Sequence, residues 1–182
     1  MMVLGINPGT KRANVKTSPG VSWVLLNCDD LQPRFVECGS FDPTRSAIYA
    51  FAMRMSRVDA VGVEAAAGAI FAPYRAPGVL AQNIVAGMLL MAFHPYVREQ
   101  RVLQLSPEQW RGALTGQKTN RKRKGEASTT FDEVIERHLR VTVSGMPATA
   151  SSHMRDAVGV AVVTGRAIGR GLVKEDGSVI GL

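Results

Sequence analysis

Residues 2–10, MVLGINPGT, begin as an apolar run and end in turn residues. The apolar part, residues 3–6, is typical of a strand that is buried on both faces. Asn7 and the Pro-Gly pair that follows it favour a turn, so we expect a strand over residues 2–7 with Asn7 at its end. A polar side chain at the end of a buried strand lies at the edge of a sheet, where a ligand can reach it.

Two later segments present polar residues in the same way. Residues 60–64, AVGVE, end an expected strand over residues 59–64 with Glu64. The segment SHMRDA begins an expected helix and places His153 and Asp156 three residues apart, on one helical face. Each of these residues alone is also typical of an exposed helix start or strand end. Together with Asn7 they predict one site assembled from distant parts of the chain, with the oxygen ligands that two-metal phosphodiester chemistry requires.

The remaining pattern predicts an α/β fold in which a mixed sheet is flanked by helices. The order of strands and helices implies a central sheet that is part antiparallel and part parallel. We expect a single domain over residues 1–170 and a C-terminal tail over residues 171–182. Further strands are expected at 21–26, 34–38, 96–105 and 140–143, and helices at 44–57, 79–93, 107–116, 129–138 and 151–167.

The charge of the chain predicts a polyanionic partner. The 182 residues include 22 basic and 15 acidic side chains, which gives a net charge of +7. Residues 98–124 hold eight basic and two acidic side chains, so one region carries most of the excess. Its densest part has five basic residues in seven, and we expect these to contact nucleic-acid phosphates: Lys118, Arg121, Lys122, Arg123 and Lys124.

Other classes of protein are disfavoured by the composition. Two cysteines, Cys28 and Cys38, make neither a disulfide framework nor a zinc site, and we expect both to be reduced. The first residues lack the basic segment of a signal peptide, and no apolar run reaches the length of a membrane span. We therefore expect no membrane association and a reducing compartment that contains nucleic acid.

Four segments in this order resemble the RuvC-type Holliday junction resolvases of the RNase H-like superfamily. Residues 3–10 are similar to the opening strand of that family, whose signature is a hydrophobic residue followed by Gly-Ile-Asp-Pro-Gly. Residues 60–64 resemble its second acidic motif, and residues 152–157 resemble its closing motif. The Leu-Thr-Gly turn at residues 114–116, with basic residues after it, resembles the stretch before the DNA-contacting helix. The resemblance spans residues 2 to about 168.

The resemblance implies a nuclease of the RNase H-like fold that resolves four-way DNA junctions. Asn7, Glu64, His153 and Asp156 would surround Mg²⁺ or Mn²⁺, and a metal-activated water would attack the phosphodiester. The family works as a homodimer, and the apolar helix over residues 79–93 would form either the dimer contact or part of the core. The implied location is the cytoplasm or nucleoid, or the phage-encoded or organellar equivalent.

Aromatic side chains near Glu64 are further candidates for DNA contacts. The small-residue segment 65–75 contains Phe71 and Tyr74, which could stack on bases that are unpaired at the centre of a junction. The family uses an aromatic residue in this loop for that purpose, so Phe71 is the stronger candidate. Neither His94 nor His138 has a partner that the sequence identifies, and we interpret both as structural.

Asn7 departs from the family pattern, which has Asp at this position. An amide offers one neutral oxygen ligand where a carboxylate would offer negative charge, so we expect weak metal binding and very slow cleavage. We favour an engineered substitution that traps a DNA complex. The alternatives are a natural homologue that binds junctions without cleaving them, and a misleading resemblance in which Asn7 is a turn residue.

Three other functions are alternatives to the resolvase interpretation. The Gly-Thr-Lys-Arg segment at residues 9–12 also resembles the YqgF group of small RNase H-like proteins linked to RNA processing. A noncatalytic, structure-selective DNA-binding protein would carry Asn7 naturally. A nucleotide-binding ATPase of the actin type shares the same core, but the chain is short for two such domains and has no second Gly-rich phosphate loop.

Overall fold

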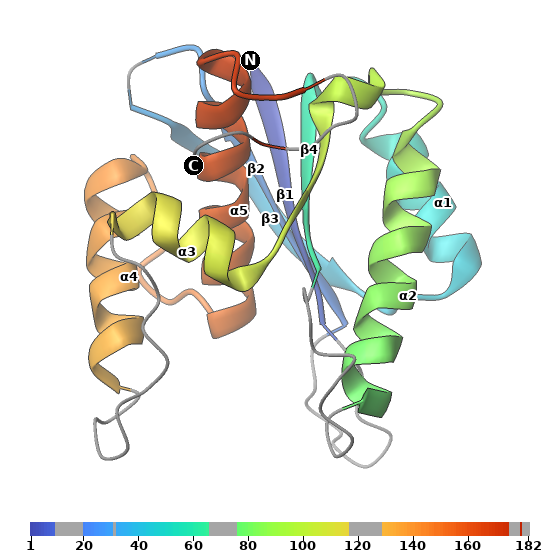
Figure 1. Ribbon diagram of the computed structural model, residues 1–182, viewed down its shortest axis with the longest axis horizontal. Helices are drawn as coiled ribbons and strands as arrows, with labels where there is room; N and C mark the ends of the chain where they lie inside the picture. The colour runs from blue at the N-terminus through green and yellow to red at the C-terminus, as the bar shows by residue number, and fades with distance from the viewer. Residues whose placement is uncertain (10–19, 31, 66–75, 117–128, 175–178, 180–182) are drawn as a thin grey trace.

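The computed structural model describes residues 1–9, 20–30, 32–65, 76–116, 129–174 and 179 of the chain. Within them, helices cover both faces of one mixed sheet, as the sequence predicted (Figure 1). The strands are β1 (Met2–Pro8), β2 (Val21–Asn27), β3 (Arg34–Phe41), β4 (Ala60–Glu64) and β5 (Val102–Leu105). The helices are α1 (Arg45–Arg54), α2 (Ala76–Phe93), α3 (Pro107–Thr115), α4 (Thr129–Thr142) and α5 (Ser152–Gly169).

The sheet has the strand order β3-β2-β1-β4-β5. The first three strands form an antiparallel meander, in which β1 pairs with β2 and β2 with β3. On its other side β1 runs parallel to β4, and β4 runs parallel to β5. The carboxyl ends of β1, β4 and β5 therefore meet at one edge of the sheet.

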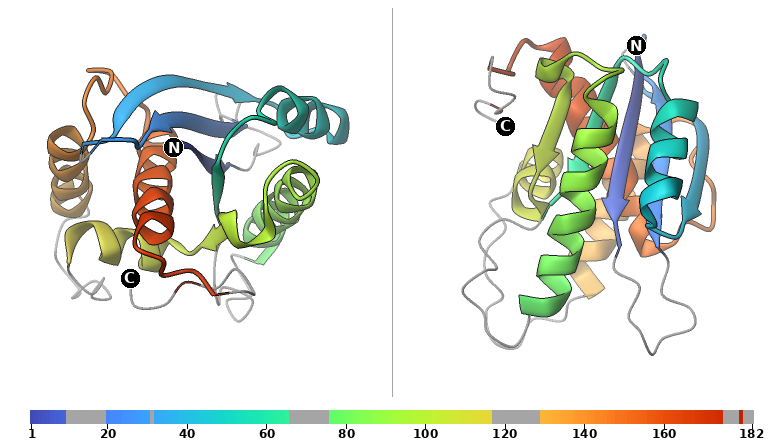
Figure 2. Two further views of the ribbon diagram at one scale, coloured as in Figure 1. Left: turned by 90° about the horizontal axis from the view of Figure 1, so that it is seen from above. Right: turned by 90° about the vertical axis from the view of Figure 1, so that its right-hand side faces the viewer.

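Each face of the sheet is buried under its own group of helices. In Figure 2, α1 and α2 lie on one side of the strands, and α5 lies on the other side with α3 and α4 beyond it. Side chains of a strand alternate between faces, so Leu4 and Ile6 pack beneath α1 and α2, whereas Val3 packs beneath α5. Asn7 continues the series that starts at Val3 and therefore faces α5.

The contact between β1 and α5 is unusually close and depends on Gly5. A Cβ atom at this position would lie 2.1 Å from the main-chain oxygen of Ala157. The absence of a side chain lets the first turns of α5 rest directly on the strand, close to its carboxyl end. Ser151 caps the helix by accepting a hydrogen bond from the backbone N–H of Met154 at 3.2 Å.

Two sequence predictions about secondary structure were wrong. Residues 140–143, expected as a strand because of the Val-Thr-Val run, instead extend α4 to Thr142. The reason is helical periodicity, since Ile135, Leu139 and Val143 are spaced four apart and are all buried beside α5. The strand expected over residues 96–105 is confined to Val102–Leu105, after a 3-10 turn at Glu99–Arg101.

Helix α2 is apolar on both its buried and its exposed face. Ala86, Leu89 and Phe93 belong to the core beneath the sheet, but Leu80 and Met91 are 62% and 69% exposed. The inner face of α2 is therefore part of the core, which is one of the two alternatives expected from the sequence, and its outer face is exposed in the single chain. Despite its composition, neither α2 nor any other helix among the described residues is long and apolar enough to cross a membrane.

Candidate active site

The carboxyl ends of β1 and β4 bring two of the predicted site residues together. Ile6 pairs with Val63 in the parallel register, so the next residues along the two strands are Asn7 and Glu64. Both face α5 and both are buried, with exposed fractions of 3% and 5%. The sequence placed these side chains at strand ends, and the strand register places them next to each other.

Helix α5 delivers Asp156 to the same place. The Nδ2 of Asn7 donates a hydrogen bond to Oδ2 of Asp156 over 3.2 Å, although the two residues are 149 positions apart. The other carboxylate oxygen of Asp156, Oδ1, lies 3.4 Å from Nη2 of Arg111. Asp156 is thus held between a neutral amide from β1 and a guanidinium from α3.

Glu64 receives a hydrogen bond from a buried indole. The Nε1 of Trp110 donates to Oε2 of Glu64 at 2.9 Å, and the Trp110 ring is fully buried. The ring lies against Gly159 of α5, where a Cβ atom would come within 2.5 Å of it. A longer contact of 3.5 Å joins Gln82 of α2 to Oε1 of Glu64.

The environment of Glu64 makes its ionised form costly. Burial raises its pKa, and the negative charge of Asp156 raises it further, to about 7. The hydrogen bonds from Trp110 and Gln82 and the positive charge of Arg111 act in the opposite direction but do not cancel the effect. The site therefore contains two carboxyl groups close enough to disfavour each other's charge, which is a common property of functional sites.

His153 lies one helical turn before Asp156 at the start of α5. Its Nδ1 atom is buried and has no hydrogen-bond partner among the described residues. A buried imidazole nitrogen without a partner is uncommon, because no hydrogen bond then offsets the free-energy cost of removing the nitrogen from water. The described contacts do not join His153 to Glu64, so the structure brings three of the four predicted residues together and leaves the fourth beside them.

The site gathers side chains of the kinds that bind divalent cations elsewhere in proteins. Within the described part of the chain, no group of three or more His, Cys, Asp or Glu side chains is arranged to hold a metal ion. The available ligands are the carboxylates of Glu64 and Asp156, the amide oxygen of Asn7 and the partnerless nitrogen of His153. Mg²⁺ and Mn²⁺ accept such oxygen ligands, and Mn²⁺ also accepts imidazole.

Three residues of the site were not predicted from the sequence, namely Gln82, Trp110 and Arg111. The start of α3 was recognisable, because Ser106 and Gln109 form a capping box with Pro at the first helical position. The pairing of Leu105 with Glu64 could not be predicted from the sequence. This pairing places the start of α3 beside the Glu64 carboxylate.

The predicted DNA-contacting residues lie outside the described residues. This applies to Phe71 and Tyr74 after β4, and to the basic residues Lys118 and 121–124 between α3 and α4. Their roles remain predictions. Of the two histidines interpreted as structural, His138 is exposed and uses Nδ1 to contact the main-chain oxygen of Val134 at 2.9 Å.

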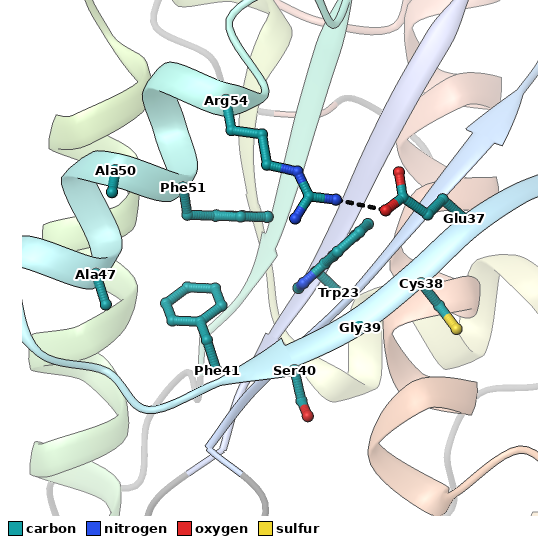
Figure 3. A pocket seen from close by; sticks show the side chains of 10 residues that line it. All are labelled: Trp23, Glu37, Cys38, Gly39, Ser40, Phe41, Ala47, Ala50, Phe51 and Arg54. Carbon is teal, nitrogen blue, oxygen red and sulfur yellow. Dashed lines mark hydrogen bonds and ion pairs between the residues drawn. The ribbon is translucent and has the colours of Figure 1, made fainter.

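A pocket of about 480 Å³ opens elsewhere, between β3 and α1. Figure 3 shows Arg54 reaching from α1 past the ring of Trp23 towards Glu37, with Phe41 and Phe51 along the wall. None of the predicted site residues lines this pocket. It lies on the α1 side of the sheet, whereas Asn7 and Glu64 face α5.

Comparison with solved structures identifies the fold. A Thermus thermophilus RuvC solved with a Holliday junction substrate superposes with a TM-score of 0.61 and 20% sequence identity, covering 96% of this chain and 98% of that chain. A second Thermus thermophilus RuvC structure gives a TM-score of 0.60 at 20% identity, over 96% and 99% of the two chains. The chain has the RuvC-type, RNase H-like fold.

Other comparisons add little to this assignment. A fowlpox virus Holliday junction resolvase aligns with a TM-score of 0.49 and 13% identity, over 94% of this chain and all of that one (100%). No protein-family model matches the chain, and no curated protein matches it in sequence. The RuvC-type fold is therefore recognised from structure, and it extends over nearly the whole chain.

Proposed function

We propose that this chain recognises four-way DNA junctions, and that it is a resolvase-type endonuclease whose centre is weakened at position 7. The observation that carries the proposal is the meeting of Asn7, Glu64 and Asp156 at one edge of a RuvC-type sheet. Three segments that are far apart in the sequence converge there, and they bring two carboxylates together with an amide where the resolvase family has a third acid. The two carboxyl groups disfavour each other's charge in the free protein, so a bound cation would relieve a real electrostatic cost.

A divalent cation, Mg²⁺ or Mn²⁺, is the proposed cofactor. Glu64 and Asp156 would hold it with their carboxylates, and His153 would supply its partnerless nitrogen. When bound, such an ion polarises a phosphodiester and activates water. The chain's own residues hold the ligands in place through hydrogen bonds: Trp110 orients Glu64, and Asn7 orients Asp156.

Asn7 is the reason to expect slow cleavage. Its amide nitrogen donates a hydrogen bond to Asp156 over 3.2 Å. An aspartate in the same place would bring a second carboxylate to that distance, which is stable only if a cation or a proton lies between them. The neutral amide therefore attracts a divalent cation less strongly than an aspartate would, and we expect slow cleavage for that reason.

The hydrogen-bond donors around Glu64 and Asp156 favour a second function, which is junction binding without cleavage. Donors from the chain approach every oxygen of Glu64 and Asp156: Gln82 and Trp110 for the first, and Arg111 and Asn7 for the second. A protein that only binds junctions would need no cation at these carboxylates, because protein donors already face their oxygens. The two functions differ in whether an acid at position 7 restores cleavage.

The DNA surface is proposed to extend from α3. This helix ends in the left-handed cap residue Gly116, and the segment with Lys118 and residues 121–124 follows it. The five positive charges there would bind phosphates and supply affinity without reading sequence. The aromatic pair Phe71 and Tyr74, which follows β4 in the sequence, would stack on unpaired bases.

The outer face of α2 is proposed as a homodimer contact. Leu80, Ile84 and Met91 project from one side of the helix with 62%, 54% and 69% of their surfaces exposed. Exposed apolar side chains in such a row are typical of protein interfaces. A symmetric dimer through α2 would present two centres to the two strands of a junction. The proposed location is wherever DNA recombines, in the nucleoid or its phage or organellar equivalent.

Junction recognition is tested by a gel-shift titration of the chain against a labelled four-way junction, with unlabelled duplex and single strand of the same sequence as competitors. EDTA is present in one series and Mn²⁺ in another. The proposal predicts that junction binding persists in a large excess of duplex. Equal competition by duplex would reject junction recognition, and preference for single-stranded RNA would instead favour the YqgF-like alternative.

A further inference from the structure

Arg111 has no role in the predicted site, yet its guanidinium faces Asp156 directly. Its Nη2 lies 3.4 Å from Oδ1 of Asp156, and its positive charge also favours the ionised form of Glu64. Arg111 therefore provides to both carboxylates some of the stabilisation that a bound metal ion would provide. Both members of the ion pair are only partly exposed, at 29% for Arg111 and 21% for Asp156, so water weakens the attraction less than at an open surface.

The position of Arg111 is set by the helix that carries it. Trp110, the preceding residue, is locked by its hydrogen bond to Glu64 and by its fit against Gly159. The guanidinium carbon of Arg111 lies 5.0 Å from the centroid of the Trp110 ring, which is within range of a cation–π interaction. The same indole thus anchors one carboxylate of the centre and supports the cation that faces the other.

The ion pair is nevertheless incomplete. A distance of 3.4 Å is longer than a good charged hydrogen bond, and the contact uses one nitrogen where arginine can use two. The Nε of Arg111 is buried and has no partner among the described residues. A guanidinium with a buried unused donor can gain by moving to a ligand that accepts two parallel hydrogen bonds, and a phosphodiester is such a ligand.

We propose that Arg111 is an exchangeable internal counter-ion, which holds Asp156 in the free protein and is displaced to a DNA phosphate when a divalent cation binds the carboxylates. The inference rests on the proposed function, because it concerns regulation of the same centre. In the free protein the guanidinium and the divalent ion compete for Asp156. In the DNA complex they cooperate, because the displaced guanidinium finds a phosphate. Cation binding without DNA should therefore be weak, and each ligand should strengthen the binding of the other.

The test measures Mn²⁺ binding in the absence of DNA, by titration calorimetry and by the electron paramagnetic resonance signal of free Mn²⁺. We expect Arg111→Gln to bind Mn²⁺ about tenfold more tightly than the parent chain, since it removes a competing positive charge next to the ligand. Arg111→Lys, which keeps the charge, should stay near the parent value. The matched control is Arg155→Gln, which removes the same charge one residue from Asp156, from a side chain that pairs with Glu136 instead.

A second measurement follows junction affinity with and without Mn²⁺. The parent chain should bind the junction more tightly when Mn²⁺ is present, and Arg111→Gln should lose most of that gain. Mn²⁺ affinity that is unchanged or weaker in Arg111→Gln, equal tightening in Arg155→Gln, or no Mn²⁺ binding by either protein would each overturn the inference. Because the first titration contains no DNA, it remains decisive even if the chain proves not to recognise junctions.

Discussion

Replacing Glu64 by glutamine should make the metal-free protein more stable at neutral and alkaline pH. In the folded chain the pKa of Glu64 is raised from the ordinary value of 4.5 to about 7 by burial and by Asp156. A group with a raised folded-state pKa binds its proton more tightly in the folded than in the unfolded state. Its favourable contribution is complete below about pH 4.5 and is lost as the pH rises through 7.

The size of the effect follows from the two pKa values of Glu64. At roughly 1.4 kcal/mol for each pH unit between them, the ionised carboxylate costs the folded state about 3 kcal/mol above pH 8. Glutamine keeps the shape and can still accept the hydrogen bond from Trp110, but it carries no charge. The Glu64→Gln variant should therefore equal the parent chain in stability near pH 4 and exceed it by up to about 3 kcal/mol at pH 8.5.

The assay is urea denaturation followed by circular dichroism between pH 4 and 8.5, with EDTA present to remove cations. Glu133→Gln serves as the control, because Glu133 is an exposed glutamate on α4. The difference between the parent and Glu64→Gln should grow through the interval from pH 4.5 to 7 and then level off. A difference that does not change with pH would refute the view that two carboxyl groups share a buried site.

Three further predictions concern packing and association. Gly5→Ala should destabilise the chain by about 3 kcal/mol in the same urea assay, because its methyl group would collide with the Ala157 oxygen, and a loss below 1 kcal/mol would contradict the close approach of α5. Thr164→Val should stabilise it by on the order of 1 kcal/mol, since the Thr164 hydroxyl is buried without a partner among the described residues, and a loss of stability would mean that the hydroxyl is bonded. Ile84→Glu should leave the fold intact, because Ile84 is 54% exposed, and should turn a dimer into a monomer in light-scattering chromatography. An unchanged dimer would exclude α2 as the interface.

Local patterns of the sequence were enough to predict the strands that carry the site. The apolar run before Asn7 and the one before Glu64 are buried strands. Glu64 is the last residue of β4, and Asn7 is the last but one of β1, which continues to Pro8. The spacing of His153 and Asp156 indicated one face of a helix, and that helix does reach Asn7. These predictions succeeded because each depends on residues that are neighbours in the sequence.

The remaining features depend on contacts between distant segments. Trp110 and Arg111 join the site only because β5 pairs with β4 in one particular register. The end of α4 was misread because a short β-branched run has the same local pattern in a strand and in a helix, and burial of Val143 beside α5 decides between them. The exposure of Leu80 and Ile84 on α2 likewise depends on which face of the helix meets the sheet.

The most direct test of the account is cleavage by Asn7→Asp. The parent chain, this variant and the double variant Asn7→Asp/Glu64→Gln are incubated with a labelled four-way junction in Mn²⁺, and the products are resolved on a denaturing gel. The account predicts paired, symmetric nicks from Asn7→Asp alone, with junction binding by all three proteins. If Asn7→Asp binds both the junction and Mn²⁺ but leaves the DNA intact, the chain is a binding protein built on a nuclease fold and the central claim is wrong.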